Sequence, residues 1–224
     1  MHGVRLRLAI PLLLAAAGMS IGCTPATLSF LLMPFVNDNI PAVCPLAKKD
    51  KEVSVALVCR AQGLETRPEL LPAEQEVADL LSKHLRKRFA ENKEKVTVVP
   101  PSRVRPYLAK SGSDAASLHE LGKTLKADYV VSLEITQFSL NDNSLRTLYR
   151  GTAEIDIKVL DVSKEEGEAT VWTQVYKREY PRGRHVDAGE MSQLQFRANF
   201  GNAIAGDLAR FFTEYPKEER NSID

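Results

Sequence analysis

The fold is decided by the stretch Asp128-Tyr129-Val130-Val131-Ser132-Leu133-Glu134-Ile135-Thr136. Its apolar side chains recur at every second position, at Tyr129, Val131, Leu133 and Ile135, and from Val131 on the residues between them are polar. A period of two is typical of a β-strand with one buried and one solvated face. At Asp128 the chain therefore changes from helices and short buried strands to the strands of an antiparallel sheet.

Two further strands are predicted after this stretch. In residues 152–159 apolar and polar side chains alternate again, and after a polar turn at residues 163–167 a third strand spans residues 168–180. That third strand places Val171 and Val175 on one side and Trp172 and Tyr176 on the other. Three strands joined by short turns form an antiparallel meander, and a helix over residues 192–214 follows with an apolar stripe at Phe196, Phe200, Ile204, Leu208 and Phe211.

The part of the chain before residue 128 has a different pattern. Residues 52–60 and 95–99 are short, nearly continuous apolar runs, as expected of buried parallel strands. Between them, residues 73–92 have one apolar face at helical spacing and predict an amphipathic helix. Helices are also predicted from Ser102, which suits an N-cap, to residue 110, and over residues 114–126.

These elements predict an α/β (α+β) fold. We expect a mixed sheet of about five strands, in which two N-terminal parallel strands join the three-stranded antiparallel meander, with helices packed on it. The helices should cover one face, because the meander strands are apolar on only one side. The predicted organisation is a signal peptide at residues 1–22, a leader at 23–50, a single globular domain at 51–216 and a polar tail at 217–224.

The first residues resemble a bacterial lipoprotein signal that ends at Cys23. Arg5 and Arg7 precede an uncharged, mostly apolar segment, residues 8–18, and Ser20-Ile21-Gly22 leads into the cysteine. The apolar segment is shorter than the ~20 residues that cross a bilayer as a helix, and its length suits a cleaved signal. The resemblance implies that Cys23 carries diacylglycerol and further acyl chains. The alternative is ordinary secretion, with Cys23 a free or disulfide-bonded cysteine.

The residue after the cysteine and the composition limit location and partners. Thr24 follows Cys23 where Asp would signal retention in the inner membrane, so we expect an outer-membrane protein that faces the periplasm. With 30 basic and 29 acidic residues the net charge is +1, and this balance argues against nucleic acid as a partner. A hydrophobic share of 44% indicates a folded chain.

Two more cysteines, Cys44 and Cys59, are candidates for a disulfide in an oxidising compartment. The alternative is that Cys59 is a small buried residue of its strand and Cys44 a free thiol. Neither their spacing nor neighbouring histidines suggest zinc. The leader also contains a strongly apolar segment, residues 28–36, which we expect to pack against the globular body, lipid headgroups or a partner.

Residues 50–215 resemble the small α/β domain shared by the amino-terminal part of TolB, the curli secretion lipoprotein CsgG and the lipoprotein activators of penicillin-binding proteins. The likeness rests on the element order and on the segments Val96-Thr97-Val98-Val99-Pro100-Pro101-Ser102-Arg103-Val104 and Leu125-Lys126-Ala127-Asp128-Tyr129-Val130-Val131. It implies an envelope lipoprotein without an assigned reaction. The chain lacks an obvious long membrane-inserting hairpin between its strands, so a pore of the curli type is not expected.

No candidate motif for catalysis is complete. His119-Glu120-Leu121-Gly122-Lys123 begins like a zinc-protease helix, but Lys123 stands where the second histidine is needed. Gly122-Lys123-Thr124 resembles the end of a phosphate-binding loop but lies in a helical stretch, with Ser117 where that loop needs glycine. His84 is expected to be a packing residue, and His185 has no recognisable Ser or Cys partner. We therefore predict neither an enzyme nor a metal or cofactor beyond the acyl chains on Cys23.

Two basic clusters are candidates for contacts. Lys83, Arg86, Lys87 and Arg88 lie toward the end of the first helix, where they complement the helix dipole. Arg178, Arg182 and Arg184, with Trp172 and Tyr176 nearby, form the best candidate partner-binding surface, because arginine and exposed aromatics are typical of binding hot spots. The alternative is that Trp172 belongs to the core and the arginines are solvated.

The leading hypothesis is a membrane-anchored envelope lipoprotein that acts as a non-catalytic binding or accessory module. Its partner would be an envelope protein or a peptidoglycan-associated component. One alternative is a subunit of an oligomeric secretion or envelope-assembly complex, as the CsgG resemblance implies. Another is a periplasmic hydrolase of unrecognised type, with a site built from dispersed histidines and carboxylates.

Overall fold

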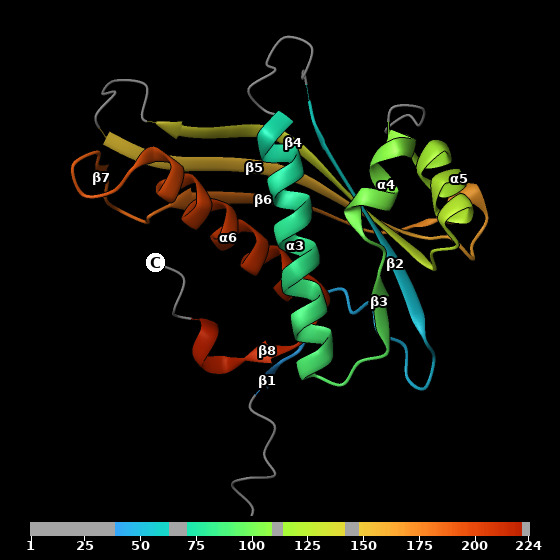
Figure 1. Cartoon of the computed structure of the whole chain (residues 1–224). Helices are drawn as coiled ribbons and strands as arrows, with labels where there is room; N and C mark the ends of the chain where they lie inside the picture. The colour runs from blue at the N-terminus through green and yellow to red at the C-terminus, as the bar shows by residue number, and fades with distance from the viewer. Residues whose placement is uncertain (1–38, 63–70, 109–113, 142–147, 221–224) are drawn as a thin grey trace, which may run out of the picture. The chain divides into compact units, whose positions relative to one another are not determined.

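A mixed sheet of six strands forms the centre of the protein, in the order β3-β2-β4-β5-β6, and β7 pairs with the far end of β5 (Figure 1). The computed structural model describes residues 39–62, 71–108, 114–141 and 148–220. The main strands are β2 (Val53–Ala61), β3 (Val96–Val98), β4 (Tyr129–Asn141), β5 (Leu148–Asp161), β6 (Thr170–Tyr180) and β7 (Val186–Asp187).

The strand directions confirm the predicted α/β class. β2 pairs in parallel with β3 and with β4, and β4, β5 and β6 form an antiparallel meander. The predicted change of period at Asp128 is the place where the chain enters β4 from the preceding helix. The Asp128 carboxylate accepts a hydrogen bond from the Ser54 amide at 2.9 Å, and this bond fixes the start of β4 beside β2.

Helices cover both faces of the sheet, and the expectation that they cover only one face is wrong. α3 (Leu71–Glu91) and α6 (Gln193–Phe212) pack on one face over Val55, Leu57, Leu133 and Ile157. α4 (Pro101–Leu108) and α5 (Ala115–Leu125) pack on the other face over Ala56, Val58, Val130 and Leu160. The physical reason is the continuous apolar run of β2, which needs cover on both sides.

Side chains cap the starts of α5 and α6, but the predicted N-cap Ser102 is wrong, because α4 begins at Pro101 and Ser102 lies inside it. The Asp114 side chain accepts from the Ser117 amide at the start of α5, and Ser192 accepts from Gln195 at the start of α6. These side chains satisfy amides that have no partner inside the helix. Lys126 ends α5 in the left-handed conformation, with φ 54°, immediately before β4.

Close packing joins α6 to the sheet and to α3. At Gly151 in β5 a Cβ would lie 2.8 Å from the ring of Phe200, so this glycine leaves room for the buried Phe200 side chain of α6. At Gly201 a Cβ would lie 3.0 Å from Leu80 of α3. The two helices are also linked on either side of this contact, by Arg197 and Glu76 at 2.7 Å and, just after both helices end, by Asn92 and Thr213 at 2.8 Å.

The segments that flank the sheet also pack on the body. β1 (Asn39–Ile40) pairs antiparallel with β8 (Tyr215–Pro216), and the Cys44 amide donates to the Phe211 carbonyl at 2.7 Å. Leu46 is fully buried in the main core. After β8, the 3₁₀ helix η5 (Lys217–Arg220) folds back beside α6.

The predicted signal peptide, Cys23 and the apolar segment 28–36 lie outside the described residues. The predicted division of the chain at residues 22, 50 and 216 therefore stays a prediction. None of the described helices combines the length and the apolar character that crossing a membrane requires.

Candidate functional site

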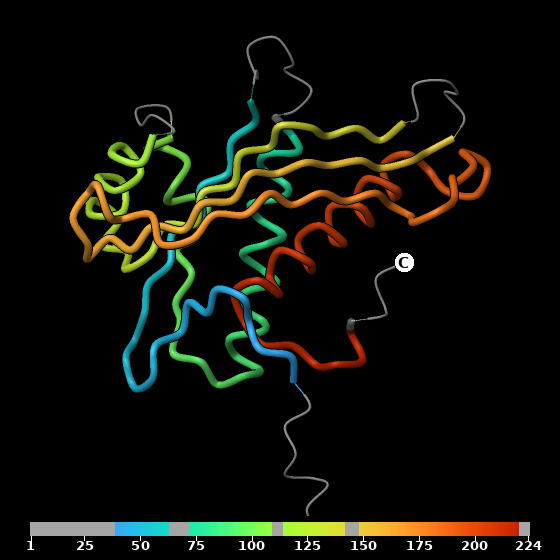
Figure 2. Tube along the Cα trace, turned by 180° about the vertical axis from the view of Figure 1, so that it is seen from behind, coloured from blue at the N-terminus to red at the C-terminus, as the bar shows by residue number. Residues whose placement is uncertain are grey.

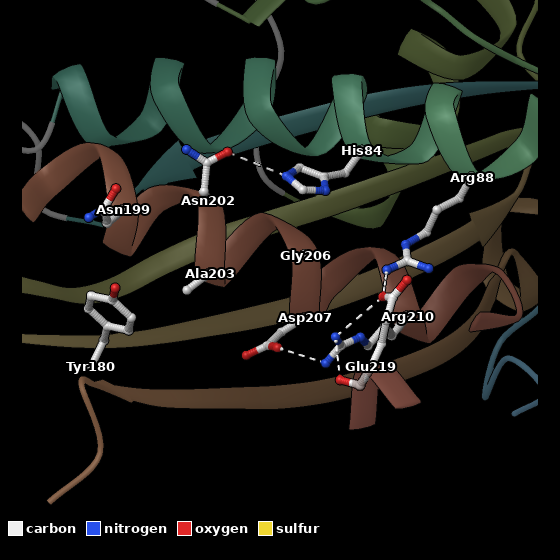
Figure 3. Close-up of a pocket in the computed structure, with 10 residues that line it drawn as sticks. All are labelled: His84, Arg88, Tyr180, Asn199, Asn202, Ala203, Gly206, Asp207, Arg210 and Glu219. Carbon is white, nitrogen blue, oxygen red and sulfur yellow. Dashed lines mark hydrogen bonds and ion pairs between the residues drawn. The ribbon is translucent and has the colours of Figure 1, made fainter. Parts of the chain in front are cut away.

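A polar pocket of about 280 Å³ lies between α3 and α6 (Figure 3). Tyr180 and Asn199 stand at one end of it and Arg88, Arg210 and Glu219 at the other. Four elements contribute to the lining, which comprises His84, Arg88, Tyr180, Asn199, Asn202, Ala203, Gly206, Asp207, Arg210 and Glu219.

Glu219 joins the two helices at the charged end of the pocket. Its side chain accepts a hydrogen bond from Arg88 of α3, and Arg210 of α6 lies 3.5 Å from the same carboxylate. Arg210 also donates to the Glu219 carbonyl at 2.8 Å. Burial works to raise the pKa of Glu219, but the two arginines hold it below its ordinary value, so the carboxylate is charged at neutral pH.

Asp207 is the centre of a second set of contacts beneath the pocket. Its carboxylate accepts from the Tyr176 hydroxyl at 2.8 Å and lies 3.5 Å from Arg178 and 3.4 Å from Arg210. Burial, and after it the charge of Asp207, raises the pKa of Tyr176, which therefore remains a neutral donor. β6 and α6 are thus linked by a buried ion pair.

His84 forms one wall of the pocket opposite Asn202. Its Nε2 lies 3.5 Å from the side-chain oxygen of Asn202. Burial is the main cause that lowers the pKa of His84, and the charges of Arg88, Lys87 and Lys83 lower it further, although the contact with Asn202 works against them. The imidazole is therefore neutral at pH 7.

This lowered pKa predicts a dependence of stability on pH. Below about pH 6.5 the unfolded chain binds a proton at His84 that the native state resists, so the unfolding free energy falls as the pH decreases toward the lower native pKa. We expect the variant His84→Gln to show a shallower fall between pH 6.5 and pH 5 in urea titrations. Equal slopes for the two proteins would contradict this assignment.

Trp172, Tyr176 and the three arginines do not form one exposed surface, so the expectation that they do is wrong. Trp172 packs against Phe211 and Phe212 with ring centroids 5.6 and 5.9 Å apart, and Tyr176 and Arg178 are buried. Their side of β6 is covered by α6, as period-two alternation against the apolar stripe of that helix requires. Arg182 and Arg184 are exposed beyond the end of β6, where Arg184 lies 3.9 Å from Glu190. Partner binding by these residues stays a prediction.

The opposite side of β6 is the exposed one. Val171 and Val175 are 39% and 48% exposed, and both belong to the uncharged segment 171–176. A shallow depression of about 390 Å³ lies beside Val175 and is lined by Asp156, Ile157, Lys158, Thr173, Gln174 and Val175. Figure 2 shows β4, β5 and β6 from this side, with α3 and α6 behind them.

β6 is also an edge strand. In the part of the chain that the structure describes, ten of its 11 residues pair with β5 on one side, with Val171 at a bulge, and no strand pairs with the other side. Backbone N–H and C=O groups along this edge can pair with another chain, although the Val175 carbonyl already accepts a hydrogen bond from the Gln174 side chain at 2.9 Å. Between Val171 and Tyr176 the strand contains no charge and no proline, the residues that usually protect such an edge.

The cysteines do not form the candidate disulfide, because Cys44 and Cys59 are both free in the structure. Cys59 is buried in β2, and Cys44 is half-buried beside the end of α6. Burial raises the pKa of both thiols, so they remain protonated at neutral pH. The sequence alternative, a buried Cys59 and a free Cys44, matches this arrangement.

The residues of the incomplete motifs are built into the packing. His119 is buried in α5 and lies 3.1 Å from the Val162 carbonyl, and Gly122 packs so closely that a Cβ would lie 2.5 Å from Val162. His185 lies between β6 and β7, in a different part of the chain from His84 and His119. Within the described ranges, no three His, Cys, Asp or Glu side chains gather as a metal ion would need.

No protein-family model and no curated protein matches the chain. Among solved structures, it is similar to the PelC dodecamer from Paraburkholderia phytofirmans, with 10% identity, 75% of this chain and 94% of that chain covered, and a TM-score of 0.42. It is also similar to lipoprotein GNA1162 from Neisseria meningitidis, with 12% identity, 61% of this chain and 88% of that chain covered, and a TM-score of 0.35. A third similar structure is the LpoB C-terminal domain from Salmonella enterica, with 14% identity, 67% of this chain and 90% of that chain covered, and a TM-score of 0.32.

These likenesses are distant, and they include a bacterial lipoprotein. The TolB-like and CsgG-like membership expected from the sequence stays a prediction.

Proposed function

We propose that this chain is a lipid-anchored envelope lipoprotein that acts as a non-catalytic binding or accessory module for another envelope component. Acyl chains on Cys23 would hold it on the outer membrane, where it faces the periplasm. Its partner would be an envelope protein or a peptidoglycan-associated component, and neither nucleic acid nor a further cofactor belongs to the proposal.

The observation that supports this function best is the exposed side and free edge of β6. An open sheet edge can accept an extended segment of a partner as an added strand, in which backbone hydrogen bonds provide affinity and side-chain pockets provide specificity. The depression beside Val175 lies next to that edge. On the same side the Lys177 ammonium lies 3.1 Å from the Glu154 carboxylate, so polar residues border the apolar ones.

Site-specific crosslinking tests this proposal. We expect a photoreactive amino acid at Val175, in the lipidated protein in intact envelopes, to crosslink to one discrete envelope component. The matched control is the same amino acid at Leu194, which is 78% exposed at the start of α6 and should give no discrete product. The same products from both positions, or none from Val175, would refute the proposed role of β6.

A subunit of an oligomeric envelope complex is a second candidate, because the same free edge can pair with a second copy of the chain. The crosslinking experiment separates the two candidates. A product with twice the mass of the chain supports self-assembly, whereas a product of another mass supports a different partner.

A further inference from the structure

Gly206 lies inside α6, on the floor of the pocket between α3 and α6. Glycine is less favourable than alanine inside a helix, because it loses more backbone freedom on folding. At Gly201 close packing against Leu80 explains the glycine. At Gly206 the nearest atom to a Cβ would be Cε1 of His84 at 3.9 Å, an ordinary contact distance. Packing therefore does not require this glycine, and its effect is to leave the pocket larger.

The charges that line the pocket balance one another. Arg88 and Arg210 contribute two positive charges, and Asp207 and Glu219 contribute two negative ones. These groups already contact one another, with Glu219 between the arginines and Asp207 beside Arg210. A ligand with a strong charge of either sign would have to displace one of these contacts, so the lining favours a neutral ligand.

The remaining polar groups offer both donors and acceptors. The side chains of Asn199 and Asn202 each carry a carbonyl oxygen and an NH₂ group, and the neutral His84 carries one donor and one acceptor. Among the described residues, neither the Tyr180 hydroxyl nor the Asn199 side-chain oxygen has a hydrogen-bond partner, and both lie at the same end of the pocket (Figure 3). Available hydrogen-bonding groups of both kinds suit a ligand rich in hydroxyl groups.

The pocket also has an aromatic wall of fixed position. The Tyr180 ring packs on Phe200 and Phe196, with centroids 5.9 and 5.7 Å apart. A ring held in this way can contact the apolar side of a ligand, while its hydroxyl bonds a polar group. The volume of about 280 Å³ is near the lower end of the usual range for ligand pockets, about 300–1,000 Å³.

We propose that this pocket binds a short neutral saccharide of one or two rings, for which Gly206 leaves the space. The sugar hydroxyls would exchange hydrogen bonds with Asn199, Asn202 and Tyr180. This site is separate from the exposed side of β6, so it can be correct whether or not the proposed docking role of β6 holds.

The test is equilibrium binding to the full-length lipidated protein, solubilised in a detergent without a sugar headgroup. The probes are cellobiose and N,N′-diacetylchitobiose, with inorganic phosphate and spermidine as charged comparison ligands. We expect saturable binding of at least one disaccharide and weaker binding of both charged compounds. No saturable binding of either disaccharide, or tighter binding of a charged compound, would overturn the proposal.

Two variants separate a binding role from a structural one. Gly206→Ala should raise the unfolding temperature, because it favours the helix without a clash, and should weaken disaccharide binding by roughly tenfold, because the methyl group occupies ligand space. Asn199→Ala should also weaken binding. Gly167→Ala is the matched control, since a Cβ there meets nothing within 4 Å, and it should bind as the native protein does. Unchanged affinity in both pocket variants would refute the site.

Discussion

The Cys23→Ser variant is expected to be almost absent from the membrane fraction, whereas nearly all of the native protein is expected there. Serine has no thiol for diacylglycerol, so the variant would lose every acyl chain. Each buried CH₂ group contributes ~0.8 kcal/mol, and a single chain holds a protein only marginally, so removing two or three chains removes stable anchoring. Fractionation with an alkaline wash, together with mass spectrometry of the mature N-terminus, measures the effect.

The matched control for this prediction is Cys44→Ser. It also removes one thiol, but from the half-buried segment beside α6, and it should leave membrane retention unchanged. A bare N-terminal residue in the native protein, or full retention of the Cys23 variant after the wash, would show that the lipid anchor is wrongly assigned.

Asp207→Ala is expected to destabilise the protein by about 3–5 kcal/mol, the usual cost of removing one partner of a buried ion pair. The side chains of Arg178 and Asp207 are only 3% and 14% exposed. The substitution removes the carboxylate that faces Arg178 and accepts the Tyr176 hydrogen bond, while the guanidinium stays in the interior. The midpoint of urea unfolding, monitored by circular dichroism, should fall with little change in the slope of the transition.

Asp79→Ala is the matched control, because it also removes an aspartate that pairs with an arginine of another element. Asp79 and Arg105 are 2.6 Å apart, but their side chains are 55% and 41% exposed. Exposed pairs contribute at most about 1 kcal/mol, so this variant should remain close to the native protein. Similar losses in both variants would mean that burial of the Asp207 pair does not govern its contribution.

Much of the candidate site could not be read from the sequence. The pocket combines His84 and Arg88 of α3, Tyr180 of β6, residues of α6, and Glu219 of η5. No local pattern indicates that these residues meet, because each is ordinary at its own position. Gly206 is the exception, since a glycine inside a predicted helix is a signal that can be noticed without a structure.

The sequence predicted the alternation of β6 correctly, but the side of the strand that faces solvent was assigned incorrectly. Alternation places Trp172 and Tyr176 together and Val171 and Val175 together. Aromatic residues near arginines resembled a contact surface, but the larger aromatic side chains pack against α6, and the smaller valines are exposed. The greater apolar area of the aromatic side explains this outcome.

The sequence by itself determined the kinds of element and their order, because hydrophobic periodicity and capping residues act over a few neighbours. The two-residue period from Tyr129 to Ile135, the apolar stripe in residues 192–214 and the continuous apolar run of β2 all identify real elements of the structure. Only the tertiary structure decided that helices cover both faces of the sheet, that β6 is an edge with its valines exposed, and that Glu219 joins Arg88 to Arg210. These features depend on contacts between residues as much as 131 positions apart, such as Arg88 and Glu219, and side-chain packing rather than local pattern selects them.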